Sequence, residues 1–177
     1  IIILRKYDLS AVGTHLMAFY TSIPAVSGDF WGIGELPIED AQILSLWFNS
    51  TLSILQLFLH RTETRGAWMK TDLRSLKDNL ILNPQALLGE ERKLMLDVFG
   101  KLAHIEFPYF LKQLKDNFPQ RVELDRAVMK VLGFNEQETM SVLPRLYKGL
   151  SQEIELLKEM MAERPPEEVG DTDNLYL

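Results

Sequence analysis

The chain has 177 residues, a mass of 20.4 kDa and a formal net charge of −6. This length predicts a single domain with a substantial core, and the 46% hydrophobic and 25% charged residues exclude wholesale disorder. The absence of cysteine excludes disulfides and thiolate chemistry, and His15, His60 and His104 lack metal-ligand spacing. The acidity excludes a protein that coats nucleic acid unspecifically, because such coating needs a cationic surface.

The sequence predicts three short strands in the first part of the chain. Residues 1–5 form a β-branched run, residues 13–21 end in aromatic side chains, and residues 30–33 follow a turn signal. The chain begins at Ile1 without methionine, runs straight into apolar sequence and has no signal-peptide pattern. We therefore expect a cytoplasmic protein that is truncated at its front.

One long helix is predicted from about residue 38 to residue 59, since Glu39 and Asp40 supply the acids that favour a first turn. Residues 41–59 carry no charge, which raises the question of a membrane span. Seven of those 19 residues are polar, which favours a buried helix in a globular core instead. We expect Trp47 to belong to that core.

The rest of the chain is predicted to become helical. Residues 67–70 and 79–83 have strand character, and a short amphipathic helix spans residues 71–77 between them. Beyond Pro84 the sequence predicts helices at residues 85–103, 108–117, 121–132 and 136–163. The last of these has an apolar stripe that we expect to face inward: Leu143, Leu146, Tyr147, Leu150, Ile154, Leu157 and Met161.

These elements predict an α+β fold in which a small mixed strand–helix unit precedes a C-terminal helical bundle. The predicted boundaries are residues 1–84 for the mixed unit, 85–163 for the helical region and 164–177 for an acidic flexible tail.

A local concentration of positive charge stands out from this acidic background. Residues 60–77 contain five cationic and two acidic side chains, a balance of +3, whereas residues 1–59 total −3 and residues 163–177 total −4. A cationic loop–strand–helix segment is what a localised phosphate-contacting patch requires. The alternative is a solvated surface with incidental charges.

Two blocks of sequence resemble a known family. Asn49-Ser50-Thr51, an apolar helix and the run His60-Arg-Thr-Glu-Thr-Arg-Gly-Ala-Trp68 resemble the target-recognition region of N6-adenine DNA methyltransferases of restriction–modification systems. They are also similar to the recognition domains of type I specificity subunits. Leu80-Ile-Leu-Asn-Pro84 resembles the strand end of that region, and residues 121–134 resemble its helical part. The resemblance covers about residues 1–160.

The resemblance implies a DNA-binding target-recognition fragment of an S-adenosylmethionine-dependent adenine methyltransferase, of the type II modification-subunit kind. Its implied partners are double-stranded DNA, an upstream catalytic domain, and a specificity or nuclease subunit, without a membrane. The chain lacks the Gly-rich cofactor loop and the Asn/Asp-Pro-Pro-aromatic motif that holds a flipped adenine. We therefore expect no catalysis, cofactor or metal in this fragment, and assign S-adenosylmethionine to its parent.

Five side chains are the candidate DNA contacts. We expect Arg61, Thr64, Arg65 and Lys70 to contact the duplex and Arg74 to support them at a phosphate. Trp68, next to this loop, is a candidate for base stacking or for the core.

Other polar residues receive structural interpretations. We expect Asn49-Ser50-Thr51 to cap a helix or to contact the backbone. Glu123 and Asp125 lie on different helix faces, so we expect them to form surface ion pairs with neighbours such as Arg121 and Arg126 rather than a catalytic carboxylate pair.

An alternative function is a protein-interaction or assembly module of a restriction–modification or phage-defence complex, which the net charge of −6 favours. DNA binding with a steep salt dependence distinguishes the two hypotheses. No motif supports an independent enzyme.

Overall fold

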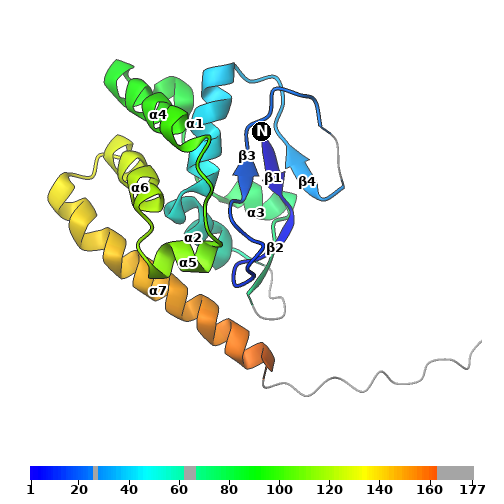
Figure 1. The fold of residues 1–177 in the computed structure, drawn as a ribbon. Coiled ribbons are helices and arrows are strands. Elements are labelled where there is room, and N and C mark those ends of the chain that lie inside the picture. Colours follow the sequence, from blue (N-terminus) through cyan, green and yellow to red (C-terminus); the bar gives the residue numbers. More distant parts are fainter. Residues whose placement is uncertain (26–27, 62–66, 163–177) are drawn as a thin grey trace, which may run out of the picture.

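The computed structural model describes residues 1–25, 28–61 and 67–162 and has an α+β fold (Figure 1). This confirms the fold class predicted from the sequence, including its C-terminal helical region. The strands are β1 (Ile2–Leu4), β2 (Lys6–Asp8), β3 (Ala18–Phe19), β4 (Phe30–Gly32) and β5 (Trp68–Lys70). The helices are α1 (Ile38–Asn49), α2 (Thr51–Leu59), α3 (Leu73–Asp78), the 3₁₀ turn η1 (Pro84–Ala86), α4 (Gly89–Leu102), α5 (Phe110–Lys115), α6 (Pro119–Val131) and α7 (Glu136–Ala162).

The strands form two small antiparallel sheets. In the first, β1 lies between β3 and β4, and Ile3 is aligned with both Ala18 and Trp31. In the second, β2 pairs with β5 and Tyr7 is aligned with Met69. The sequence did not predict β2, because a three-residue strand acquires its identity from a partner far along the chain.

The prediction of one helix over residues 38–59 is wrong. The chain breaks at Ser50, and α1 and α2 meet there at an angle of 61°. Ser50 has extended backbone angles, and its hydroxyl donates to the Trp47 carbonyl at 2.7 Å while accepting from the Ser53 amide at 3.2 Å. Ser50 is therefore the N-cap of a new helix, a position that serine favours.

The prediction of a strand at residues 79–83 is also wrong. Leu80 makes no ladder, because the Gln56 side chain accepts from its amide at 3.0 Å and donates to its carbonyl at 3.5 Å. Asn83 then accepts from the Gln85 amide at 3.1 Å and begins η1. This apolar segment is thus held against α2 rather than added to a sheet.

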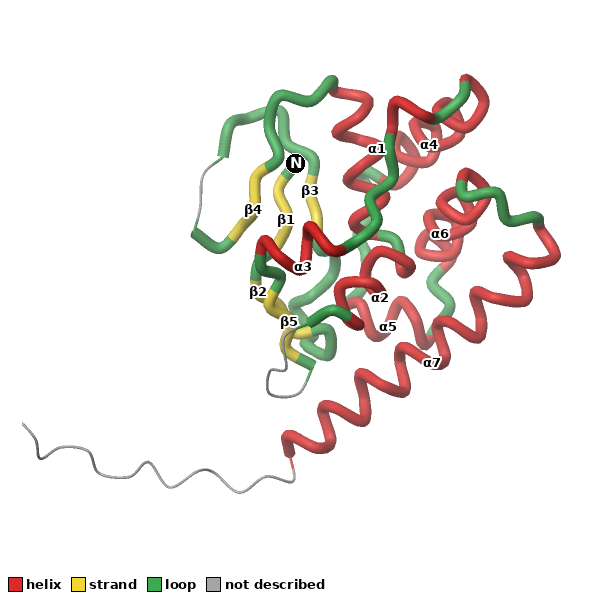
Figure 2. Tube along the Cα trace, turned by 180° about the vertical axis from the view of Figure 1, so that it is seen from behind, coloured by secondary structure: helices red, strands yellow, loops and turns green. Residues whose placement is uncertain are grey.

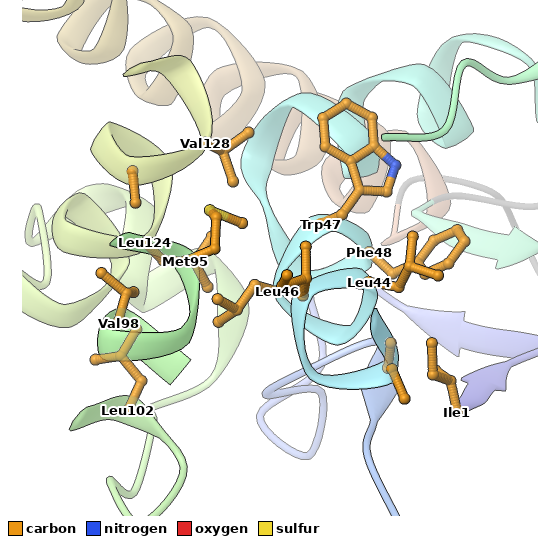
Figure 3. Packing of buried hydrophobic residues seen from close by; sticks show 14 of the residues in the cluster. Ile1, Leu44, Leu46, Trp47, Phe48, Met95, Val98, Leu102, Leu124 and Val128 are labelled. Atoms are coloured by element: carbon orange, nitrogen blue, oxygen red, sulfur yellow. The ribbon is translucent and has the colours of Figure 1, made fainter. Parts of the chain in front are cut away.

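The first hydrophobic cluster lies around α1, which runs between the three-stranded sheet and α4 (Figures 1 and 2). Figure 3 shows Leu46 directed toward Met95 and Val98 of α4. Trp47 is 4% exposed, which confirms its predicted place in the core. This cluster combines residues from both sides of residue 84.

The second cluster joins the β2–β5 sheet to α2, α5 and α7. The predicted inward stripe of α7 is confirmed for its first six residues, which are buried or half-buried. Met161, the seventh, is 40% exposed. The stripe loses its partner there because α7 extends past the rest of the fold (Figures 1 and 2).

Within the described residues, no single helix has the length and apolarity needed to span a membrane; only α1 and α2 taken together do, with the 61° bend between them.

Candidate nucleic-acid interface

The two-stranded β2–β5 ribbon has one buried and one solvent-facing side. Tyr7 and Met69 point into the second cluster and are 4% and 1% exposed. Side chains alternate along a strand, so the neighbours on each side of this pair occupy the opposite face. That face holds the exposed side chains Lys6, Lys70 and Trp68, with half-buried Asp8 opposite Trp68.

The predicted contact residues Lys70 and Arg74 are both solvent-exposed. Lys70 lies in β5 and belongs to the outer face of the ribbon. Arg74 lies in α3, with a 92% exposed side chain whose Nε is 3.8 Å from Asp78 Oδ2. A surface ion pair of this kind is weak, so the Arg74 guanidinium is accessible to a stronger anionic partner.

Arg61 is held more firmly. Its guanidinium carbon lies 3.9 Å from the centroid of the Phe58 ring, and its Nη1 donates to the Phe58 carbonyl at 2.8 Å. Next to it, His60 Nδ1 lies 2.7 Å from Asn79 Oδ1, which joins the end of α2 to the segment after α3. The remaining two predicted contacts, Thr64 and Arg65, lie outside the described residues.

Sequence reasoning missed Lys6 and Arg5 as neighbours of this face. Arg5 packs its guanidinium carbon 4.5 Å from the Trp31 ring centroid and donates from Nη1 to the Gly28 carbonyl at 2.7 Å. Trp31 Nε1 donates to the Thr71 carbonyl at 2.7 Å, which ties the two sheets together. The alternation of polar and apolar side chains at Lys6, Tyr7 and Asp8 is the only local trace of β2, and three residues are too few to predict a strand.

Behind the ribbon, a buried polar network surrounds the junction of α1 and α2. Asp125 of α6 accepts from the Thr51 amide at 2.7 Å, the Thr51 hydroxyl at 2.6 Å and the Tyr147 hydroxyl at 2.6 Å. Burial raises the pKa of Asp125, an effect that the positive charge of Arg121 opposes. Burial and the Asp125 charge also raise the pKa of Tyr147.

Arg121 is the cationic member of this network. Its Nε and Nη2 donate to Gln113 Oε1 at 2.9 and 2.7 Å, and its Nη1 donates to the Asn49 carbonyl. Burial lowers the pKa of Arg121. The network accounts for backbone groups left unpaired where α1 ends and α2 begins.

The prediction that Arg121 and Asp125 form surface pairs is therefore wrong, since they are 0% and 1% exposed. Both lie on the side of α6 that faces the helix break, where polar backbone groups need partners. Glu123, on another side of α6, does form a surface pair with Lys101 at 3.0 Å. Arg126 pairs with Glu136 at 3.1 Å.

The Asn49-Ser50-Thr51 motif is confirmed as a set of backbone contacts and caps. Asn49 Oδ1 accepts from the amides of Met17 and Ala18 at 2.7 and 3.1 Å, and its Nδ2 donates to the Ala18 carbonyl at 2.6 Å. These bonds occupy the backbone of β3 that the sequence predicted to form a longer strand. The motif fixes how α2 leaves α1, and α2 ends at Leu59, directly before His60 and Arg61 in the chain.

The side chains of this face offer positive charge and one aromatic ring. The ammonium groups of Lys6 and Lys70 belong to the same face as the exposed indole of Trp68. In the described part of the chain no group of His, Asp and Glu is placed to hold a metal ion. Comparison of the chain with protein-family models, curated proteins and solved structures finds no match.

Proposed function

We propose that this chain is the DNA-binding target-recognition part of an S-adenosylmethionine-dependent adenine-N6 DNA methyltransferase of a restriction–modification system. The observation that carries the proposal is the outer face of the β2–β5 ribbon and α3. In a chain of net charge −6, Lys6 and Lys70 are exposed on the ribbon beside Trp68, and Arg74 is exposed on α3, the helix that follows β5. Cations that flank an aromatic ring suit a nucleic-acid backbone with its bases.

The cations of this face suit different parts of a duplex. Lys70 is a flexible point charge and suits a phosphate, as does the exposed Arg74. Arg61 is stacked on Phe58 and bonded to a backbone carbonyl, so its planar donors start from a defined position. A guanidinium positioned in this way suits the bidentate contact that distinguishes guanine.

The resemblance to the target-recognition region implies a division of labour within the parent protein. An upstream catalytic domain of the parent protein would bind S-adenosylmethionine, flip the adenine and methylate it, while this region selects and clamps the site. The parent would work in the cytoplasm, with a specificity or nuclease subunit as a further partner.

A second candidate function, an assembly module, is favoured by a different feature. The end of α7 extends past the fold and exposes Leu156 and Met160, each 50% accessible (Figures 1 and 2). Apolar side chains on a protruding helix favour contact with another protein.

Salt-dependent binding separates the two candidates. The affinity of the 177-residue chain for duplex DNA is measured over a series of salt concentrations, for the wild type and for Lys70→Gln, Arg74→Gln and Lys93→Gln. Lys93 is an exposed lysine of α4, a helix that lies away from the β2–β5 ribbon in both views, and is the matched control. Each of the first two substitutions should lower the slope of log affinity against log salt by about 0.9, and Lys93→Gln should leave it unchanged. Absence of duplex binding at low salt overturns the proposal and favours the assembly module.

The parent protein supplies the test of site choice. Expression of the complete gene in a methylation-deficient host should produce N6-methyladenine in the host DNA, measured by mass spectrometry. Deletion of residues 1–177 should abolish it. A folded complete product that leaves adenine unmethylated contradicts the methyltransferase assignment.

A further inference from the structure

Lys6 and Lys70 face each other directly across the β2–β5 ribbon. The ladder bonds on either side of them run from the Thr71 amide to the Arg5 carbonyl, at 2.9 Å, and from the Leu9 amide to the Ala67 carbonyl, at 3.2 Å. Hydrogen-bonded pairs alternate along an antiparallel ladder, so Lys6 and Lys70 form a non-hydrogen-bonded pair. This is the closer type, with about 4.5 Å between Cα atoms.

Both lysines are exposed, and among the described residues neither forms an ion pair with a carboxylate. The acid on the same face, Asp8, turns its Oδ1 to the amide and hydroxyl of Ser10, at 2.7 and 2.8 Å. Like charges directly opposite one another destabilise a strand pair. An anion between the two ammonium groups therefore lowers the electrostatic energy of the pair.

The ribbon resists separation of the two lysines. Thr71, next to Lys70, donates from its amide to Arg5 and accepts at its carbonyl from Trp31, so the end of β5 is attached to both sheets. Tyr7 of β2 and Met69 of β5 lie on the inner side of the ribbon and are buried in the core. The backbone cannot move apart to relieve the repulsion without breaking these contacts.

We propose that Lys6 and Lys70 together bind a single phosphate group of the DNA backbone. Two ammonium groups on one face match the two non-bridging oxygens of one phosphodiester. Trp68, two residues from Lys70 on the same face, lies where the adjoining sugar or base would pass. This inference rests on the proposed function and deepens it, because it assigns the pair to sequence-independent positioning of the duplex.

The test measures how many DNA phosphates the two lysines contact. Duplex affinity of the 177-residue chain is measured against salt for the wild type, Lys6→Gln, Lys70→Gln, the double variant and the control Lys93→Gln. A shared phosphate predicts that the double variant lowers the salt slope by about 0.9, whereas two separate phosphates predict about 1.8. The fold-loss of affinity in the double variant should also be smaller than the product of the two single losses. A slope change near 1.8 with multiplicative losses, or an unchanged slope, overturns the shared site.

A second measurement separates failure of the pair from failure of the proposed function. The thermal midpoint is measured in inorganic phosphate and in chloride at equal ionic strength. Phosphate should raise the midpoint of the wild type by about 2 °C or more and should have less than half that effect on either single variant. If this holds while duplex DNA does not bind, the oxyanion site stands and the DNA-recognition function fails. If phosphate has no specific effect and the duplex slope is unchanged in the double variant, the pair is not a phosphate site.

Discussion

Asp125 accepts hydrogen bonds from both donors of Thr51, from the amide at 2.7 Å and from the hydroxyl at 2.6 Å. A carboxylate of α6 thereby binds the first backbone amide of α2, while the Ser50 hydroxyl accepts from the Ser53 amide. A negative charge at a helix N-terminus is favourable, and here it is buried together with the guanidinium of Arg121. The helical region thereby fixes the direction of α2, the helix that leads to Arg61.

Replacing Asp125 by alanine should strongly destabilise the fold. The substitution leaves the Thr51 amide, the Thr51 hydroxyl and the Tyr147 hydroxyl without an acceptor and leaves Arg121 as an uncompensated buried charge. We expect the free energy of unfolding to fall by about 3–5 kcal/mol in urea denaturation. Tyr147→Phe, which removes one of these bonds, should cost only about 1–2 kcal/mol. Equal losses for the two variants would contradict the central role of the carboxylate.

Asn49 should be required for the order of β3. Asn49→Ala removes the acceptor of the Met17 and Ala18 amides, and we expect a loss of about 2–3 kcal/mol in the free energy of unfolding. Hydrogen exchange followed by NMR should show faster exchange at these two amides. Exchange in α6 should keep its relative protection, and unchanged protection of the Met17 amide would refute the contact.

Tyr7 should make the protein sensitive to alkali. Burial raises the pKa of Tyr7 to about 12, against the ordinary value of about 10. Between these values the native state keeps the proton that the unfolded state has lost, so the free energy of unfolding decreases as the pH rises from about 10 to about 12. The loss from this group should reach about 3 kcal/mol. In denaturation curves measured across this pH range, Tyr7→Phe should lack this decrease in the free energy of unfolding. If the variant loses stability as steeply as the wild type, another group causes the pH dependence.

Replacement of glycine by alanine should stabilise the protein at position 149 and destabilise it at position 133. Gly149 lies inside α7 with open space where a Cβ would be placed, so Gly149→Ala should stabilise the protein by about 1 kcal/mol. Gly133 ends the turn after α6 with a φ of 91°, which an alanine adopts only with strain. Gly133→Ala should therefore destabilise it by about 1 kcal/mol, as thermal melts of the two variants would show.

Trp68 should report on DNA directly. It is 47% exposed, whereas Trp47 is buried, so stacking on a base should quench the fluorescence of Trp68. Trp68→Phe should abolish most of the quenching that duplex DNA produces, and Trp68→Ala should weaken affinity by about tenfold. If the quenching persists in Trp68→Phe, Trp31 rather than Trp68 is the tryptophan that contacts the DNA.

Long periodic patterns in the sequence predicted their elements well. The apolar stripe of α7, Pro108 before α5 and Pro119 at the first position of α6 are local features, and local features suffice for an amphipathic helix. The break at Ser50 was missed because apolar sequence continues on both sides, so the pattern of hydrophobicity could not reveal where one helix ended.

The candidate site could be predicted only in part. Lys70 and Arg74 followed from the local charge balance, and both are exposed. Lys6 could not be assigned to the same face, because only the pairing of β2 with β5 brings it opposite Lys70. The buried state of Arg121 and Asp125 was equally hidden, since it depends on which backbone groups a distant helix break leaves unpaired.

The side-chain amide of Asn49 takes the place of a neighbouring strand at the edge of β3. By occupying the outward amide and carbonyl of Ala18, a helix side chain closes one margin of the three-stranded sheet as a neighbouring strand would. In the described part of the chain, the other margin, β4, has no such cover. Strand addition by a further polypeptide is therefore restricted to one side of this sheet, along Phe30–Gly32.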